Sequence, residues 1–357
     1  MKRIAALLIT VILMMGTFVS CGGNKNNSTS DSKSEIAMIV DESGVDDGSF
    51  NQTAWEKIEE FSGETDRTCT YYTAKKGEKE SYLKLIDKAV KKDAKLIVVS
   101  GSSFETAVFA AQTTYPKVDF LLIDGVPHDE NNVYSTAENT IAVIFAEEEA
   151  GFLAGYAAVK DGYKKLGFMG GQQIPPVKRY GYGFVQGAAY ACGEEEQKIE
   201  LRYAYTDTFE ESKEVRNLAE SWYKEGTKVI FACGGAMGKS VMRAAEDKGG
   251  KTIGVDVDQS GMSDTVITSA KKGIANAVST VLKEYGNDMF VGGIAFNYTA
   301  KNKGVALEME NAGFKKFTEE DYKKIFKKLK KGEIELKKDT EVKAITDITG
   351  DWITVVQ

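Results

Sequence analysis

Short apolar runs alternate with longer amphipathic stretches along most of this 357-residue chain, and no other feature constrains the fold as strongly. Strands that alternate with helices in this way are typical of parallel sheets with crossover helices. We therefore predict an α/β fold with two doubly wound parallel-sheet lobes, joined by a hinge and separated by a cleft. The strands are expected at residues 36–40, 68–72, 96–100, 120–124 and 140–145 in the first half, and at 165–169, 200–205, 229–232, 252–257 and 266–268 in the second.

Apolar residues recur at helical spacing between these runs. Tyr82, Leu83, Ile86 and Ala89 form one such face, with lysines and acids on the opposite side. Further helices are expected at residues 151–159, 183–190, 272–285 and 321–331. The last of these is rich in lysine, and we interpret its charges as a solvated face rather than a membrane patch.

The amino terminus has the pattern of a targeting segment. Two cations precede an apolar run at residues 4–15 that is too short to span a bilayer, and Ser20 stands directly before a cysteine. This looks like a bacterial lipoprotein cleavage box, so residues 1–21 are predicted to be a signal peptide whose Cys21 becomes lipidated. A plain secretory signal with an incidental cysteine is the alternative. Residues 22–35, rich in Gly, Asn, Ser and Lys, are expected to be a flexible tether.

The composition excludes several classes of function. The roughly 320 residues that remain are too many for one typical core and fit two domains. A formal net charge of −7 gives no reason to expect nucleic acid as a partner. One histidine, His128, which we expect in a solvent-exposed loop, nearly excludes a His-based metal cluster or a Ser-His-Asp triad. Beyond Cys21, two of the odd set Cys69, Cys192 and Cys233 could form a disulfide, but buried thiols are the better interpretation.

The stretch at residues 41–55 joins the first predicted strand to a helix. In open α/β sheets such loops lie at the carboxyl ends of strands, where ligands bind. Ser49 or Asn51 could cap the helix. The chemistry-bearing residues of the stretch are Asp41, Asp46, Asp47, Phe50 and Asn51. Carboxylates accept hydrogen bonds from hydroxyls, and an aromatic face stacks on a flat ring, so a ligand with both a sugar and a heterocycle would satisfy this loop.

This motif closely resembles the entry motif of the basic membrane protein family of substrate-binding lipoproteins. The family pattern is an Asp, a glycine turn, a pair of acids and then Ser-Phe-Asn, which matches Asp41, Gly44, Asp46, Asp47, Ser49, Phe50 and Asn51. The best-understood members resemble purine nucleoside receptors of ABC importers. The resemblance implies a type I periplasmic-binding-protein-like fold, no enzymatic activity, no cofactor and an ABC permease as partner. It also implies a lipid-anchored protein, usually a monomer, on the outer face of the bacterial cytoplasmic membrane.

Later segments resemble the family in the same order. In residues 170–184, prolines are expected to stiffen a loop before Gly183-Phe184 opens a helix. The resemblance places Phe184 across the cleft from Phe50, so that the two rings clamp a base. Without the resemblance, a core position for Phe184 is the better interpretation.

Two further segments supply polar candidates. By resemblance, Asp256 accepts from ribose hydroxyls, whereas Asp258 could instead cap the following turn. The family's ligand-contacting lysine falls on Lys272, with Lys271 as the alternative if the register shifts by one.

The match weakens at residues 100–107. Family members commonly offer an acid toward the base edge here, and this chain offers Glu105 or Thr106 depending on the alignment.

The predicted lobes are discontinuous in sequence. The first is expected to comprise residues 36–145 and 266–290, and the second residues 146–265 and 291–357. The stretch 233–240 follows a strand as a phosphate-binding P-loop would, but that pattern requires glycine where Cys233 stands. Its glycines are instead expected to bring backbone close to the cleft.

Two alternatives to a purine nucleoside receptor remain. The same fold could bind another small ligand, such as a sugar or a signalling metabolite, because paired aromatics flanking acids also suit pyranose rings. The acids at Asp41, Asp46 and Asp47 superficially resemble those of calcium-dependent nucleoside hydrolases. The spacing argues against a hydrolase, because Ser43 stands where those enzymes carry a further Asp.

Overall fold

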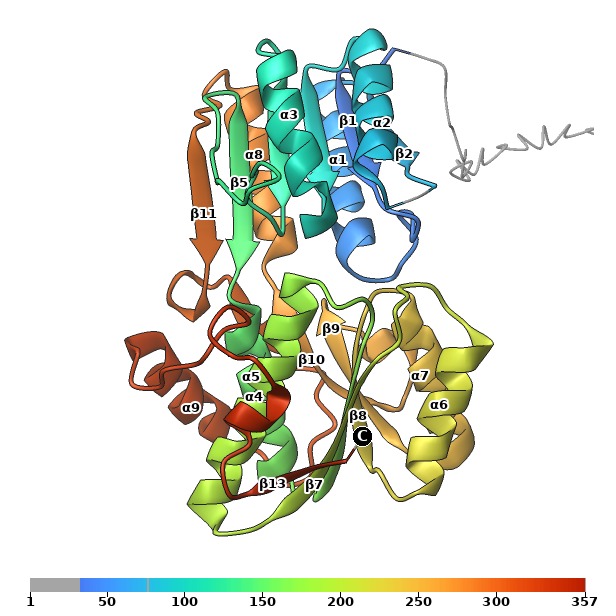
Figure 1. The fold of residues 1–357 in the computed structure, drawn as a ribbon, viewed down its shortest axis with the longest axis vertical. Coiled ribbons are helices and arrows are strands. Elements are labelled where there is room, and N and C mark those ends of the chain that lie inside the picture. Colours follow the sequence, from blue (N-terminus) through green and yellow to red (C-terminus); the bar gives the residue numbers. More distant parts are fainter. Residues whose placement is uncertain (1–32, 76, 357) are drawn as a thin grey trace, which may run out of the picture.

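The computed structural model describes residues 33–75 and 77–356, which form two α/β lobes stacked one above the other (Figure 1). The predicted signal peptide, Cys21 and most of the predicted tether lie outside these residues. The first lobe is built on a fully parallel six-stranded sheet in the order β2-β1-β3-β4-β5-β11. Its strands are β1 (Ile36–Val40), β2 (Cys69–Thr73), β3 (Leu96–Ser100), β4 (Asp119–Ile123), β5 (Thr140–Phe145) and β11 (Ile294–Tyr298).

The second lobe repeats this strand order and adds one strand at its edge. Its sheet runs β13-β7-β6-β8-β9-β10-β12, and only the β10–β12 pair is antiparallel. The strands are β6 (Lys165–Gly170), β7 (Ile199–Tyr205), β8 (Val229–Cys233), β9 (Lys251–Asp256), β10 (Val266–Lys272), β12 (Val305–Leu307) and β13 (Ile353–Val356). The predicted fold class, two doubly wound parallel lobes, is therefore confirmed.

The predicted lobe boundaries were wrong at two strands. The segment 266–272, assigned to the first lobe, is β10 and pairs with β9 in the second sheet. The segment 294–298, assigned to the second lobe, is β11 and pairs in parallel with β5 in the first sheet. Over residues 33–75 and 77–356, the chain therefore crosses between the lobes three times, after β5, after β10 and after β11. Apolar spacing alone could not reveal this, because it predicts that a segment is a strand without indicating which sheet the strand joins.

Helices cover both faces of each sheet. In the first lobe α1 (Phe50–Thr65) and α8 (Ile274–Gly286) lie on one face, and α2 (Lys79–Lys91) and α3 (Glu105–Thr114) on the other. In the second lobe α4 (Glu147–Lys160) and α5 (Pro175–Glu195) oppose α6 (Lys213–Lys224) and α7 (Met237–Lys248). Strand β1 illustrates why both faces need helices, because its alternate residues face opposite sides and are apolar on each. One core cluster includes Ile36, Met38 and Val40, and the other includes Ala37 and Ile39.

Helices α4 and α5 pack unusually closely through glycines. A Cβ atom at Gly155 would lie 2.0 Å from the carbonyl oxygen of Phe184, and one at Gly187 would lie 2.0 Å from that of Phe152. Only glycine allows backbones to approach this closely. The contact fixes the middle of α4 against α5.

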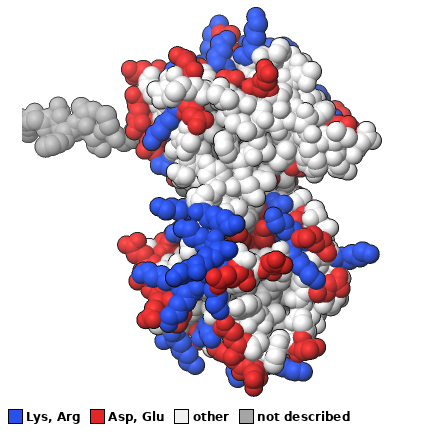
Figure 2. Space-filling model, turned by 90° about the vertical axis from the view of Figure 1, so that its left-hand side faces the viewer, with Lys and Arg blue, Asp and Glu red and all other residues white. Residues whose placement is uncertain are grey.

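The basic helix predicted near the carboxyl end is present as α9 (Glu319–Lys331). Lys323 and Lys324 are exposed and pair with Glu319 and Glu320 one turn earlier. The side of the molecule on which α9 lies faces the viewer in Figure 2, where lysines and acids intermix over the lower lobe. The predicted solvated face is therefore confirmed.

We predict that Gly155→Ala destabilises the protein by about 1–3 kcal/mol, because the added methyl group overlaps the backbone of α5. Urea denaturation would measure the loss. Gly63→Ala is the matched control, because Gly63 is an exposed residue of α1 with no atom within 4 Å of an added Cβ. There the same change should stabilise by roughly 0.5–1 kcal/mol. Equal effects at the two positions would contradict the close packing of α4 on α5.

Candidate ligand-binding site

A cleft between the lobes lies at the carboxyl ends of both parallel sheets. In sheets of this strand order, ligands bind where the order reverses, which is between β1 and β3 in the first lobe and between β6 and β8 in the second. The space between the cleft walls amounts to about 580 Å³, including the part open to solvent. Its main side chains are those of Asp41, Ser43, Asp47, Phe50, Asn51, Ser100, Asp124, Val177, Tyr180, Phe209, Cys233, Asp256 and Lys272.

The loop before α1 is held by the carboxylate of Asp47. Its Oδ1 accepts from the backbone N–H groups of Ser49 (2.9 Å) and Gln52 (3.0 Å), and its Oδ2 accepts from that of Asn51 (3.0 Å). A carboxylate satisfies orphan amides at a helix start and suits the positive end of the helix dipole. Asp47, rather than the predicted Ser49 or Asn51, therefore caps α1.

Asn51 ties this loop to the end of β3. Its side chain donates to Asp41 Oδ1 (3.2 Å) and accepts from the Ser100 hydroxyl (2.7 Å). Asp41 Oδ1 also accepts from the backbone N–H of Ser43 at 3.2 Å. Asp41 and Asn51 thus lie in the cleft in defined orientations, and their role toward a ligand stays a prediction.

Lys272 is the centre of the charged groups in the cleft. Its side chain is 2% exposed, and its ammonium pairs with Asp124, with Glu147 Oε1 (3.1 Å) and with Asp256 Oδ1 (3.9 Å). The rings of Phe50, Phe145 and Tyr180 surround the same nitrogen, with centroids 5.0–5.5 Å away. One buried cation therefore joins acids from both lobes to an aromatic cage.

These groups shift one another's ionisation. Burial raises the pKa of Asp124 to about 7, although Lys272 opposes the shift. Burial would raise the pKa of Glu147 too, but attraction to Arg179 (Nε–Oε2, 2.5 Å) and to Lys272 lowers it overall. Burial acts to lower the pKa of Lys272, and the three carboxylates more than offset this, so its pKa is raised. Lys272 stays charged, and the pKa of Asp124 lies high enough for this acid to take up a proton near neutral pH.

Asp124 and Asp256 share a backbone conformation that is rare outside glycine. Their φ angles are +66° and +67°, in the left-handed region, where aspartate is tolerated better than most residues. Asp124 follows β4, and Asp256 ends β9, the strand in the same place in the second sheet. Such strained positions cluster at functional sites. Asp124 was absent from the predicted site residues, although the aspartate that ends the run 120–124 was a visible signal.

Hydroxyl groups already donate to both carboxylate oxygens of Asp256, and each oxygen can accept one further hydrogen bond. Ser49 Oγ donates to Oδ2 at 2.8 Å, and Tyr180 Oη donates to Oδ1 at 3.3 Å. Asp124 Oδ1 is buried without a hydrogen-bond partner among the described residues. A buried acceptor left unpaired is costly, so a donor on a ligand would be stabilised there.

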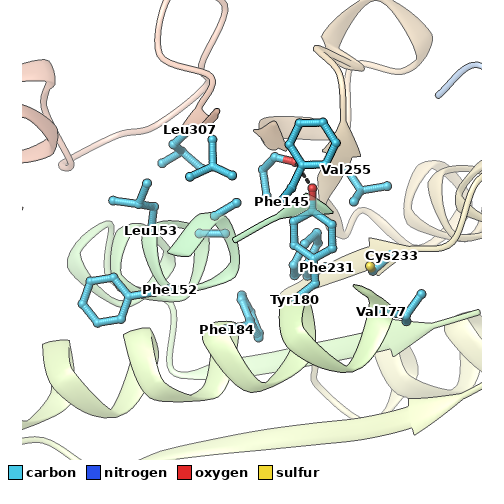
Figure 3. Packing of buried hydrophobic residues seen from close by; sticks show 14 of the residues in the cluster. Phe145, Phe152, Leu153, Val177, Tyr180, Phe184, Phe231, Cys233, Val255 and Leu307 are labelled. Atoms are coloured by element: carbon cyan, nitrogen blue, oxygen red, sulfur yellow. Dashed lines mark hydrogen bonds between the residues drawn. The ribbon is translucent and has the colours of Figure 1, made fainter. Parts of the chain in front are cut away.

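The second predicted aromatic clamp residue, Phe184, lies in the core instead of the cleft. Its side chain is fully buried, with its ring centroid 5.4 Å from that of Phe231. Figure 3 shows Phe184 pointing from α5 into the packed interior beside Phe231, below Tyr180. The physical reason is the start of the helix: Pro175 and Pro176 occupy its first turn, where proline is favoured, so Phe184 falls in mid-helix.

The rings that do line the cleft from the second lobe are Tyr180 and Phe209. Tyr180 lies one turn before Phe184 on α5, and Phe209 follows β7 in the loop that packs on Gly171, where an added Cβ would lie 2.5 Å from the Phe209 ring. Sequence reasoning missed both. A lone phenylalanine between acids and threonines in a loop was the available signal for Phe209.

Glu105 was also predicted for the cleft and does not line it. Its Oε1 accepts from the backbone N–H of Val126 (2.8 Å), and its Oε2 lies 3.4 Å from His128 Nε2. Glu105 therefore serves its own lobe by fixing the loop after β4. His128, expected to be exposed, is half-buried against this carboxylate and the ring of Tyr134.

The remaining alternatives are resolved by contacts. Lys271 pairs with Glu308 away from the cleft, so Lys272 is the lysine that enters it. Asp258 accepts from the backbone N–H of Ser260 (2.9 Å) and from Asn311 (2.8 Å), which confirms its structural role. The thiols of Cys69, Cys192 and Cys233 are free, and Cys69 is only half-buried. Nowhere do the described residues bring three or more His, Cys, Asp or Glu side chains together as a metal ion would need.

Two lobes of this topology enclose an acid- and aromatic-lined cleft that suits a small solute. A family model described as ABC transporter substrate-binding protein PnrA-like matches residues 33–340. The chain therefore belongs to the Bmp family of ABC transporter substrate-binding proteins, also called basic membrane proteins.

Individual relatives agree with this assignment. The chain is 29% identical to the ABC transporter nucleoside-binding protein BmpA of Lactococcus lactis, over 87% of this chain and 92% of that one. It is 32% identical to basic membrane protein B of Borreliella burgdorferi, over 79% and 83% of the two chains. Among solved structures, an ABC transporter solute-binding protein from Aeropyrum pernix shares the fold, with a TM-score of 0.76 at 20% identity over 87% and 95% of the chains.

The family also decides the general class of activity. Its members bind solutes for ABC transporters and are not enzymes, so the nucleoside hydrolase alternative is set aside. Substrate-binding proteins of ABC importers are extracytoplasmic. Within residues 33–75 and 77–356, no helix combines the length and apolar character needed to cross a membrane.

We predict that the wild type loses stability relative to Asp124→Asn as the pH rises from 4 to 8. The folded pKa of Asp124, about 7, exceeds its unfolded value of roughly 3.9, so its contribution is complete below about pH 4 and is lost through pH 7. Urea denaturation midpoints across this range would measure the trend.

Asp258→Asn is the control for this pH series. Burial alone raises the pKa of Asp258, but hydrogen bonds from Ser260 and Asn311 lower it overall. Its difference from the wild type should therefore not decline over the same range. A constant difference between the wild type and Asp124→Asn would mean that Asp124 is ionised throughout.

Proposed function

We propose that this chain is the substrate-binding lipoprotein of an ABC importer for purine nucleosides. The observation that carries the proposal is the pairing, in one cleft, of half-buried rings from both lobes, Phe50 and Phe209, with the buried acceptors of Asp124 and Asp256. The rings would stack on the base from either side, at roughly 1–3 kcal/mol each. The carboxylates would accept from ribose hydroxyls or base N–H groups. A relative of this chain is named as nucleoside-binding.

The ligand enters a cleft that favours a neutral or positively charged guest. Among the described residues that line it, Lys272 is the only lysine or arginine, and three carboxylates already surround its ammonium. Asp41 and Asp47 add further negative charge. A phosphate group would meet repulsion without a free cation, which favours nucleosides over nucleotides.

The setting of the protein follows from the same proposal. Lipidation at Cys21 would hold the receptor on the outer face of the bacterial cytoplasmic membrane, where closure of two lobes over a ligand precedes delivery to an ABC permease. The receptor would act as a monomer and without a cofactor. A sugar is the main alternative guest, because rings that flank acids also suit pyranoses, and an unrelated metabolite is another.

Isothermal titration calorimetry tests the ligand class. Protein freed of carried-over ligand by unfolding and refolding should bind inosine, guanosine or adenosine with micromolar or tighter affinity, and cytidine more weakly because its ring is smaller. The matching 5′-monophosphate should bind about 100-fold more weakly, equivalent to about 2.7 kcal/mol of repulsion. Absence of heat with every purine nucleoside, together with binding of a simple sugar, would overturn the assignment.

Alanine at either clamp ring should weaken nucleoside binding. Phe50→Ala and Phe209→Ala are each expected to cost about 1–3 kcal/mol, or roughly 5- to 150-fold in Kd, because each removes one stacking face. Phe184→Leu is the matched control, since its ring lies fully in the core. It should lower the denaturation midpoint and leave Kd within about twofold. Weakened binding in Phe184→Leu with normal binding in Phe209→Ala would restore the original pairing of Phe50 with Phe184.

A further inference from the structure

A turn of the first lobe, residues 46–49, accepts hydrogen bonds from two side chains of the second lobe that do not line the cleft. The ammonium of Lys239 donates to the carbonyl oxygen of Asp46 at 3.1 Å. The side-chain amide of Gln259 donates to the carbonyl oxygen of Gly48 at 3.2 Å. Neither Lys239 nor Gln259 is among the residues that form the cleft wall.

Lys239 belongs to the P-loop-like stretch 233–240, which the binding site leaves unexplained. It stands in the first turn of α7, where a cation is disfavoured by the helix dipole. Its side chain leaves the helix and reaches the first lobe. The contact with a backbone carbonyl offsets that cost and needs no particular side chain at position 46.

Hydrogen bonds within the second lobe fix the position of Gln259, whose side-chain amide contacts the first lobe. The residue is 1% exposed, its Oε1 accepts from the backbone N–H of Val255 at 3.0 Å, and its own backbone N–H donates to Ser269 Oγ at 3.1 Å. Only its Nε2 faces the first lobe. Gly48, with φ of +71°, fits beneath Met262, where a Cβ would lie 3.0 Å from the methionine methyl carbon.

The turn lies far from the hinge. The three crossovers follow β5, β10 and β11 on one side of the molecule, whereas the loop before α1 meets α7 on the opposite side (Figure 1). Opening about those crossovers separates Asp46 and Gly48 from the second lobe by the largest displacement. Both hydrogen bonds therefore exist only when the lobes are closed.

We propose that Lys239 and Gln259 form an interlobe clasp that sets how long the closed receptor retains its ligand. The clasp stabilises the closed state without contacting the ligand, so it biases the open–closed equilibrium for any guest that the cleft accepts. The inference rests on the proposed function only in that a ligand binds between closing lobes. Because the ligand enters the open state, loss of the clasp raises the dissociation rate, and it raises the association rate only to the extent that the ligand-free receptor is closed.

The test uses Lys239→Met, which keeps the aliphatic stem, and Gln259→Glu, which keeps the acceptor for Val255 and removes the donor. Lys248→Met is the matched control on the same helix, since its ammonium pairs with Glu220 within the second lobe at 2.9 Å. Stopped-flow dissociation of the tightest-binding nucleoside should accelerate about 2- to 13-fold in each clasp variant, the effect of one hydrogen bond, and by roughly the product in the double variant. Thermal midpoints without ligand should match the wild type.

Small-angle X-ray scattering separates failure of the clasp from failure of the ligand assignment. Without ligand, the double variant should show a larger radius of gyration than the wild type and Lys248→Met, whatever the natural guest. If no nucleoside binds, the proposed function fails, and the scattering comparison alone decides the clasp. Dissociation rates within twofold of the wild type, or equal radii of gyration where no nucleoside binds, would overturn it.

Discussion

The buried ammonium of Lys272 is the interaction on which the site depends. Lys272 ends β10 at one crossover, and Glu147 begins α4 at another, so the ion pair between them ties two of the three connections together. Asp124 and Asp256 approach the same nitrogen from opposite lobes. An unpaired charge at this depth would be prohibitively costly, whereas a charge shared among three carboxylates is tolerated. The cluster therefore specifies how the lobes meet more than it adds stability.

The close packing of α4 on α5 through glycines positions two charged side chains near Lys272. Glu147 is the first residue of α4, and Arg179, which holds its second oxygen, lies near the start of α5. Because Gly155 and Gly187 let the two backbones touch, the relative position of these side chains is fixed by main chain rather than by flexible contacts. The same helix α5 presents Tyr180 to the cleft and Phe184 to the core. Packing far from the cleft therefore determines which ring a ligand meets.

Sequence reasoning predicted the lobes and part of the cleft for identifiable reasons. The alternation of apolar runs reports strand and helix directly, and a motif after β1 with acids, glycines and an aromatic ring points to a strand-end loop. It misplaced Phe184 because prolines were taken as loop formers when they began a helix. It missed Asp124, Tyr180 and Phe209 because their importance arises from three-dimensional convergence. Each of these is a single residue at a strand end, in a helix turn or in a loop, and it belongs to no sequence motif that would predict a place in the cleft.

The two lobes are more alike than their sequences suggest, and the cleft exploits that likeness. Asp124 and Asp256 occupy corresponding strand ends, adopt φ angles within a degree of each other, and both reach Lys272. Their environments nevertheless differ: two hydroxyls donate to Asp256, while one oxygen of Asp124 has no hydrogen-bond partner among the described residues. Asp124 and Asp256 therefore have different roles. Asp256 joins the lobes in the structure as it stands, and Asp124 keeps an acceptor for a donor that the described residues do not supply.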